Sequence, residues 1–242
     1  LPVQIADHDK GAFCGHCQGP GAADPRPRPG CKRHAVGKLH LWLRSGFAAA
    51  LQYRLRRDQQ DQRWGHERMS SLTDSNIAIV GYGNIGKTIA GMLGNFEVTI
   101  TAFSKSGRDG ALTLDNFDRL LPTFDVIILI LPLNDQTRHL MNATRLAAMK
   151  DGAALINVAR GPVVDTDALI AELNSGRITA GLDVTDPEPL PAGHPLWSAK
   201  NVIITPHVGG DSAAFIPRGR KLVEEQIARY ASGQPLHHIV AQ

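Results

Sequence analysis

A glycine-rich loop between an apolar run and a helical pattern is the feature that most constrains the fold. The apolar run Asn76–Val80 leads directly into the hexapeptide GYGNIG at 81–86. Gly81 permits a tight turn, Gly83 lets the backbone approach a pyrophosphate, and Gly86 lets the following helix pack closely on the strand. The N-terminus of that helix offers unpaired N–H groups and a positive dipole end to phosphates. This pattern favours a dinucleotide-binding turn over a purely structural one.

Apolar runs alternate with helical patterns along the rest of the chain. The sequence predicts strands at Asn76–Val80, Val98–Phe103, Asp125–Leu131, Ala153–Asn157, Ala180–Val184 and Val202–Thr205. It predicts helices at Ile85–Leu93, Leu114–Leu121, Thr137–Met149, Asp165–Ser175 and Ser212–Ser232. Unbroken apolar strands such as DVIILIL are typical of a parallel sheet that is covered by helices on both faces. The predicted fold class is therefore α/β, a doubly wound parallel sheet of the Rossmann-type dinucleotide fold.

Three segments are expected along the chain. Residues 1–38 are rich in proline and glycine, show neither strand nor helix periodicity, and are predicted to form a short irregular N-terminal arm. Residues 39–211 are predicted to form the dinucleotide-binding domain, including a leading helix that ends near Trp64. Residues 212–242 are predicted to supply a C-terminal helix.

The arm has two open interpretations. Its composition is compatible with a segment translated outside its ancestral reading frame. Alternatively, Cys14 and Cys17 form a CxxC pair and Cys31 and His34 a CxxH pair, and three thiolates with one imidazole can hold a tetrahedral zinc ion. The first interpretation is favoured, and no metal site is assigned.

Composition excludes several classes of function. No run of about 18 apolar residues exists, so a membrane span is not expected. The first ten residues lack the basic start and apolar stretch of a secretory signal, and no Cys follows position 31, so a cytoplasmic location is expected. Residues 1–70 hold 12 Lys/Arg against 6 Asp/Glu, yet no nucleic-acid-binding motif accompanies this charge, so no nucleic-acid partner is expected.

The end of the second predicted strand indicates which dinucleotide is bound. An acid that binds the ribose hydroxyls of NAD usually stands there. Here Ser104, Lys105 and Ser106 follow the strand, with Arg108 nearby. A hydroxyl and cations suit a 2′-phosphate, whereas an acid would repel it. NADP(H) is therefore favoured over NAD(H), unless Asp109 reaches back to the strand end.

Four later segments carry a family resemblance. They are NVARGPVVD at 157–165, GLDVTDPEPLP at 181–191, HPLW at 194–197 and TPHVGG at 205–210. Together with the glycine loop, these segments resemble the D-isomer-specific 2-hydroxyacid dehydrogenases, and among them the glyoxylate/hydroxypyruvate reductases. The resemblance covers about residues 39–242. Members of that family carry a small α/β substrate domain ahead of the leading helix, where this chain has the irregular arm.

The resemblance implies a catalytic triad. Reducing a 2-keto acid requires a cation for the substrate carboxylate, a proton donor for the developing alkoxide, and a carboxylate that keeps the donor protonated. The resemblance assigns these roles to Arg160, His207 and Glu188, respectively. It also implies that Asp183 binds the nicotinamide carboxamide. His139 and His194 fit the pattern less well and receive no role.

The expected cofactor contacts extend along the predicted carboxyl edge of the sheet. They are Gly81, Gly83, Asn84, Ile85, Gly86, Ser104, Lys105, Ser106, Leu131, Pro132, Val158, Ala159, Asp183, His207 and Gly209. The expected activity is hydride transfer between NADP(H) and a small 2-keto or 2-hydroxy acid such as glyoxylate or hydroxypyruvate. The resemblance further implies a homodimer with the helix at 39–64 in its interface. The alternative is a catalytically impaired module that binds dinucleotide only.

Overall fold

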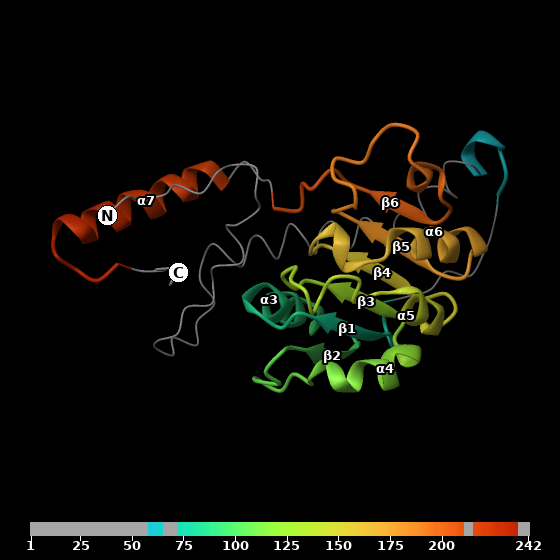
Figure 1. Ribbon diagram of the computed structural model, residues 1–242, viewed down its shortest axis with the longest axis horizontal. Helices are drawn as coiled ribbons and strands as arrows, with labels where there is room; N and C mark the ends of the chain where they lie inside the picture. The colour runs from blue at the N-terminus through green and yellow to red at the C-terminus, as the bar shows by residue number, and fades with distance from the viewer. Residues whose placement is uncertain (1–57, 65–71, 211–214, 237–242) are drawn as a thin grey trace.

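The computed structural model describes residues 58–64, 72–210 and 215–236 (Figure 1). The predicted arm at 1–38, with its possible zinc ligands, lies outside these residues. Of the predicted leading helix, only the end is described, and it is helical at 58–60. The homodimer interface expected there stays a prediction.

Six parallel strands form one sheet. Their bounds are β1 Asn76–Val80, β2 Thr99–Phe103, β3 Val126–Leu129, β4 Ala154–Asn157, β5 Thr179–Leu182 and β6 Val202–Ile204. The order β2-β1-β3-β4-β5-β6 reverses the direction of winding between β1 and β3. On the outer side of β2, Leu112 forms an isolated parallel β-bridge with Phe103. Larger doubly wound sheets have a further strand at this place. The predicted fold class is confirmed, and its carboxyl edge at β1 and β3 is where such sheets bind ligands.

The α-helices that follow β1 are α3 Asn84–Leu93, α4 Phe117–Leu120, α5 Ala143–Ala148, α6 Thr166–Ser175 and α7 Phe215–Ala231, with short 3₁₀ turns at Leu114–Asn116, Leu121–Thr123, Gly161–Val163 and Pro195–Ser198. Each of these α-helices follows a strand, and α3 to α6 connect one strand to the next. No helix among the described residues is long and apolar enough to cross a membrane.

Helices cover both faces of the sheet, so consecutive strand residues are buried on opposite sides. Ile77 and Ile128 pack with α3 on one face, whereas Ala78 and Ile127 belong to the cluster with α4, α5 and α6 on the other. All four residues of β3 are buried. Each fully buried Ile or Leu contributes roughly 1.5–3 kcal/mol, so this two-sided burial stabilises the rigid edge that carries the site.

The helix predicted at 137–149 and the strand predicted at 125–131 differ most from the observed elements. The helix predicted at 137–149 was wrong in its first half, because α5 begins only after Asn142, whose side chain accepts a hydrogen bond from the Arg145 N–H. Before it, Met141 forms a bridge with Val164 and cannot be helical. The strand predicted at 125–131 ends at Leu129, where pairing with β1 and β4 ends.

Helix α7 projects away from the sheet in Figure 1. It is described over Phe215–Ala231 and contains Pro217, and the start predicted at 212–214 lies outside the described residues. Along it Ile216, Val223, Ile227 and Tyr230 are exposed. The resemblance implies that this helix packs toward a substrate domain, and that stays a prediction.

Candidate active site

The glycine loop closes against its neighbouring strand end. Gly81 has a φ of +112°, and a Cβ atom there would lie 2.9 Å from the Leu131 nitrogen and closer still to the Ile130 carbonyl. A Cβ on Gly86 would likewise collide with the carbonyl of Gly81. Only glycine permits this approach of turn, helix and strand, as the spacing of the loop predicted.

The start of α3 is suited to an anion. Gly83 is the N-cap residue, and among the described residues no side chain caps the helix and no acid stands in its first turn. The backbone N–H groups at this helix start, including that of Ile85, are therefore suited to a pyrophosphate. This is the fit that a dinucleotide requires, and it is provided by backbone alone.

Ser104 stands at the end of β2, where an NAD-binding acid would be expected. Its Oγ accepts a hydrogen bond from the Gly107 N–H at 3.1 Å, which shapes a short turn. Lys105, Ser106 and Arg108 are exposed around this turn. Asp109, the acid that the sequence left as an alternative, contacts the Nζ of Lys87 in α3 at 2.5 Å. Two cations and two hydroxyls thus surround the strand end.

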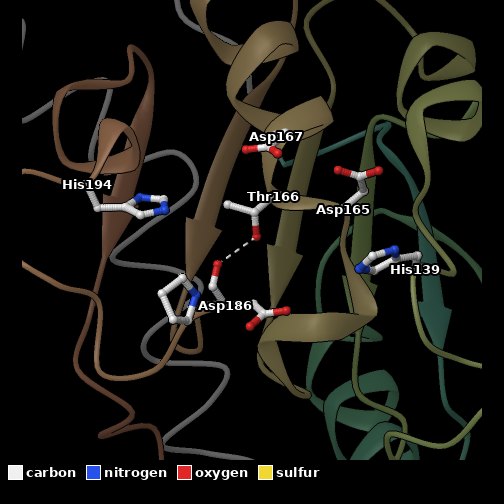
Figure 2. A pocket seen from close by; sticks show the side chains of 7 residues that line it. His139, Asp165, Thr166, Asp167, Asp186 and His194 are labelled. Carbon is white, nitrogen blue, oxygen red and sulfur yellow. Dashed lines mark hydrogen bonds between the residues drawn. The ribbon is translucent and has the colours of Figure 1, made fainter.

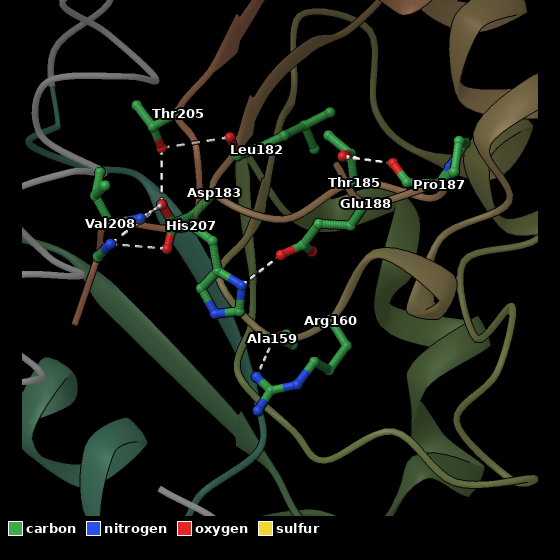
Figure 3. A network of polar contacts seen from close by, with 11 residues as sticks. Ala159, Arg160, Leu182, Asp183, Thr185, Pro187, Glu188, Thr205, His207 and Val208 are labelled. Carbon is green, nitrogen blue, oxygen red and sulfur yellow. Dashed lines mark hydrogen bonds and ion pairs between the residues drawn. The ribbon is translucent and has the colours of Figure 1, made fainter. Parts of the chain in front are cut away.

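His207 and Glu188 form a close pair. His207 Nδ1 lies 2.6 Å from Glu188 Oε1, and their side chains are 36% and 38% exposed, so both remain reachable from solvent (Figure 3). The backbone of His207 has a φ of +53°, which non-glycine residues adopt infrequently. Its N–H donates to the carbonyls of Asp183 and Thr205, both at 2.9 Å. Tertiary contacts therefore set the direction of the imidazole.

Asp183 organises the loop that carries His207. It is 1% exposed at the end of β5. Its Oδ1 accepts hydrogen bonds from Thr205 Oγ1 and the Val208 N–H, and both of its oxygens accept from the Gly209 N–H. The carboxylate is thus engaged within the chain, in addition to the carboxamide contact that the resemblance implies. These contacts hold the loop after β6 onto β5.

Arg160 follows β4 and is half-buried. Its Nη1 donates to the Ala159 carbonyl at 2.6 Å, and Asn157 Nδ2 donates to the Arg160 carbonyl at 3.0 Å. In Figure 3 the guanidinium lies below the imidazole of His207, on the side away from Glu188. The cation and the acid–base pair therefore project from neighbouring loops at one edge of the sheet.

Gly161 brings those two loops into backbone contact. A Cβ at this position would lie 2.7 Å from the Asp186 nitrogen and closer still to the carbonyl of Thr185. The turn that carries Arg160 therefore packs directly against the segment that leads to Glu188. Loss of this contact would change the separation of the two charged side chains.

The other expected cofactor residues lie along the same edge. Leu131 follows β3 and is 9% exposed, and Val158 and Ala159 follow β4 and are buried. Gly209 is also buried, whereas Pro132 is exposed. These residues cluster by position at the carboxyl ends of β3, β4 and β6, and their contact with a cofactor stays a proposal.

A separate hollow of about 340 Å³ lies at the start of α6 (Figure 2). Its lining comprises His139, Asp165, Thr166, Asp167, Asp186, Pro187 and His194. None of the triad residues line it. In the part of the chain that the structure describes, no group of three His, Cys, Asp or Glu side chains is arranged to hold a metal ion. His139 and His194 line this hollow, whereas His207 does not.

Sequence reasoning did not assign roles to Asn157, Gly161 and Thr205. Asn157 was detectable as the polar residue that ends an apolar strand. The close approach at Gly161 and the bond from Thr205 to Asp183 depend on contacts across 20 or more residues, which no local pattern reports.

A doubly wound parallel sheet with a glycine turn after β1 defines a dinucleotide-binding domain, here with an ionisable pair at its carboxyl edge. The model of the D-isomer specific 2-hydroxyacid dehydrogenase NAD binding domain matches residues 48–209. The chain belongs to this family, as the resemblance predicted.

Relatives agree with this assignment. The glyoxylate reductase of Thermofilum pendens is 35% identical over 189 residues, which are 74% of this chain and 56% of that protein. The glyoxylate/hydroxypyruvate reductase B of Salmonella newport is 43% identical over 141 residues, 55% of this chain and 43% of that protein. The chain spans about half the length of these curated relatives.

A solved structure shows the same fold. It is a D-isomer specific 2-hydroxyacid dehydrogenase from Xanthobacter autotrophicus in complex with NADPH and MES. The TM-score is 0.74 at 34% identity, covering 89% of this chain and 90% of that chain.

Proposed function

We propose that this protein transfers a hydride between NADP(H) and a small 2-keto acid such as glyoxylate or hydroxypyruvate. The observation that carries the proposal is the 2.6 Å contact between His207 and Glu188 beside the turn of Arg160. The reductase requires this pair, whereas an impaired relative that only binds dinucleotide can retain it without using it. Turnover therefore discriminates between the two hypotheses.

Each triad residue has a distinct task in this proposal. The nicotinamide ring, when bound, supplies the hydride. Arg160 holds the substrate carboxylate with its planar guanidinium and polarises the carbonyl. Nδ1 of His207 is engaged by Glu188, so Nε2 gives the proton to the developing alkoxide. Glu188 stabilises the positive imidazolium and fixes its orientation, as a carboxylate beside a catalytic histidine does.

The preference for NADP(H) is supported by the end of β2. Ser104, Lys105 and Arg108 provide a hydroxyl and two cations, and the nearby Asp109 is paired with Lys87. The related Xanthobacter protein was solved with NADPH. A homodimer and a cytoplasmic location are part of the same proposal.

The test combines turnover with binding. Oxidation of NADPH is followed by absorbance with glyoxylate and with hydroxypyruvate, and cofactor affinity is titrated separately. His207→Ala should lower kcat by at least about 100-fold, since acid–base catalysis contributes about 10²–10⁴-fold, while NADPH binding persists.

His139→Asn is the matched control. His139 is exposed with a φ of +50°, a conformation that asparagine tolerates, so this variant should retain the turnover of the parent chain. Unchanged turnover in His207→Ala contradicts the assignment of the proton donor. Cofactor binding without turnover in the parent chain contradicts the reductase proposal itself.

A further inference from the structure

Asn157 is a buried polar side chain that the proposed mechanism does not use. It ends β4, paired in register with Leu129 of β3 and Leu182 of β5, and it is 1% exposed. Burying an amide is costly unless its polar atoms are hydrogen-bonded. Both ends of this amide are paired, and both partners belong to the Arg160 turn.

The amide spans that turn. Asn157 Oδ1 accepts a hydrogen bond from the Ala159 N–H at 3.0 Å, and its Nδ2 donates to the Arg160 carbonyl at 3.0 Å. The guanidinium in turn donates to the Ala159 carbonyl at 2.6 Å. The Asn157 side chain, which lies on the rigid sheet, therefore holds the backbone at both ends of the pair Ala159 and Arg160. The carbonyl of Ala159 within this pair accepts the hydrogen bond from the guanidinium.

We infer that Asn157 is a positioning residue for Arg160: its amide sets the direction in which the guanidinium meets the substrate carboxylate. The inference rests on the proposed function. The guanidinium extends from this turn and donates to the Ala159 carbonyl within it, so the backbone of the turn contributes to the direction of the guanidinium. Strand β4 ends at Asn157, and the hydrogen bonds of the Asn157 amide fix the backbone beyond the strand as far as Arg160.

Two substitutions distinguish the contributions of the two hydrogen bonds that the Asn157 amide makes. Asn157→Ala removes both. Asn157→Asp has nearly the same shape and keeps the acceptor for the Ala159 N–H, but it places a second acceptor against the Arg160 carbonyl and so loses the donor. Asn76→Ala is the control, since Asn76 begins β1 and its Nδ2 donates to the Thr123 carbonyl, whereas the triad follows the carboxyl ends of the parallel strands.

Steady-state kinetics of the full chain form the first test. Asn157→Ala should raise KM for the keto acid and lower kcat/KM by about 100-fold, the cost of a displacement of about 1 Å, while NADPH still binds. Asn157→Asp should fall between Asn157→Ala and the parent, and Asn76→Ala should match the parent. A lower kcat with unchanged KM in Asn157→Ala indicates a merely structural role and overturns the inference.

A spectroscopic test decides the question without turnover. In chain labelled with ¹⁵N-arginine, the Nε resonance of Arg160 is assigned by its disappearance in Arg160→Lys. Asn157→Ala should shift or broaden this resonance, and those of Arg145 and Arg177, which bind Asp118 and Glu172, should not move. An unmoved Arg160 resonance overturns the inference. If the parent chain shows no turnover, the proposed function fails, but the Arg160 resonance still tests whether Asn157 positions Arg160.

Discussion

Replacing Gly161 with alanine should separate the two halves of the triad. The new Cβ would lie 2.7 Å from the Asp186 nitrogen, where ordinary contact begins at about 3.4 Å. The Arg160 turn and the segment leading to Glu188 must therefore move apart by at least about 0.7 Å, and by more near the Thr185 carbonyl. Because the colliding atoms are backbone, no side-chain rotation relieves the overlap.

Two consequences follow, with different magnitudes. Overpacking of this kind costs about 1–3 kcal/mol of unfolding free energy. Displacing a substrate-binding group by about 1 Å costs about 100-fold in rate. We therefore expect Gly161→Ala to fold with reduced stability and to lose most of its turnover, since Arg160 and Glu188 no longer hold their native separation.

The assay pairs urea unfolding with NADPH oxidation in the presence of glyoxylate. Gly91→Ala is the matched control: Gly91 lies in α3, and a Cβ there has no atom within 4 Å. Alanine in this helix should raise stability by about 0.5–1 kcal/mol and leave turnover unchanged. The reasoning is refuted if Gly161→Ala unfolds at the parent's urea concentration with undiminished turnover, because the backbone contact would then be absent in solution.

Two further changes test the cofactor site and the acid stability of the fold. Ser104→Asp should lower the ratio of kcat/KM for NADPH to that for NADH by at least about tenfold, since a hydrogen bond to a charged group is worth about 1.5–3 kcal/mol and the new carboxylate repels a 2′-phosphate; an unchanged ratio contradicts the role of the β2 end. The pKa of Asp118 lies below its ordinary value of 3.8 because Arg145 donates a side-chain hydrogen bond to it, an effect that burial opposes and the Arg145 charge reinforces. A carboxyl group whose pKa is lower in the folded than in the unfolded state stabilises the fold at pH values above its unfolded-state pKa. This contribution is lost as the pH falls from that value through the folded-state pKa. Asp118→Asn should therefore be less sensitive than the parent to acidification below pH 3.8 in thermal unfolding, and an identical acid dependence would show that the pair with Arg145 does not persist in solution.

Local patterns sufficed for the central sheet and its first turn. The run at Asn76–Val80 and the glycine spacing at 81–86 predicted β1, the turn and α3 within one residue. Both depend on short-range properties, namely apolar runs that only a two-sided sheet buries and glycines that only a tight turn requires. The stretch at 137–149 failed because a helical pattern competed with an Asn142 cap and with the bridge from Met141 to Val164, a contact across the chain.

The candidate triad of Arg160, Glu188 and His207 came from motifs that follow predicted strand ends and from the family resemblance, and its roles stay a proposal. The resemblance also implied that Glu188 pairs with His207, and the two lie 2.6 Å apart. No local pattern reports that the buried Asp183 carboxylate holds the loop after β6. These contacts exist only once β4, β5 and β6 lie side by side, since that pairing brings their carboxyl ends to one edge. The sequence thus specified which chemical groups are present, and the tertiary structure decided which of them meet.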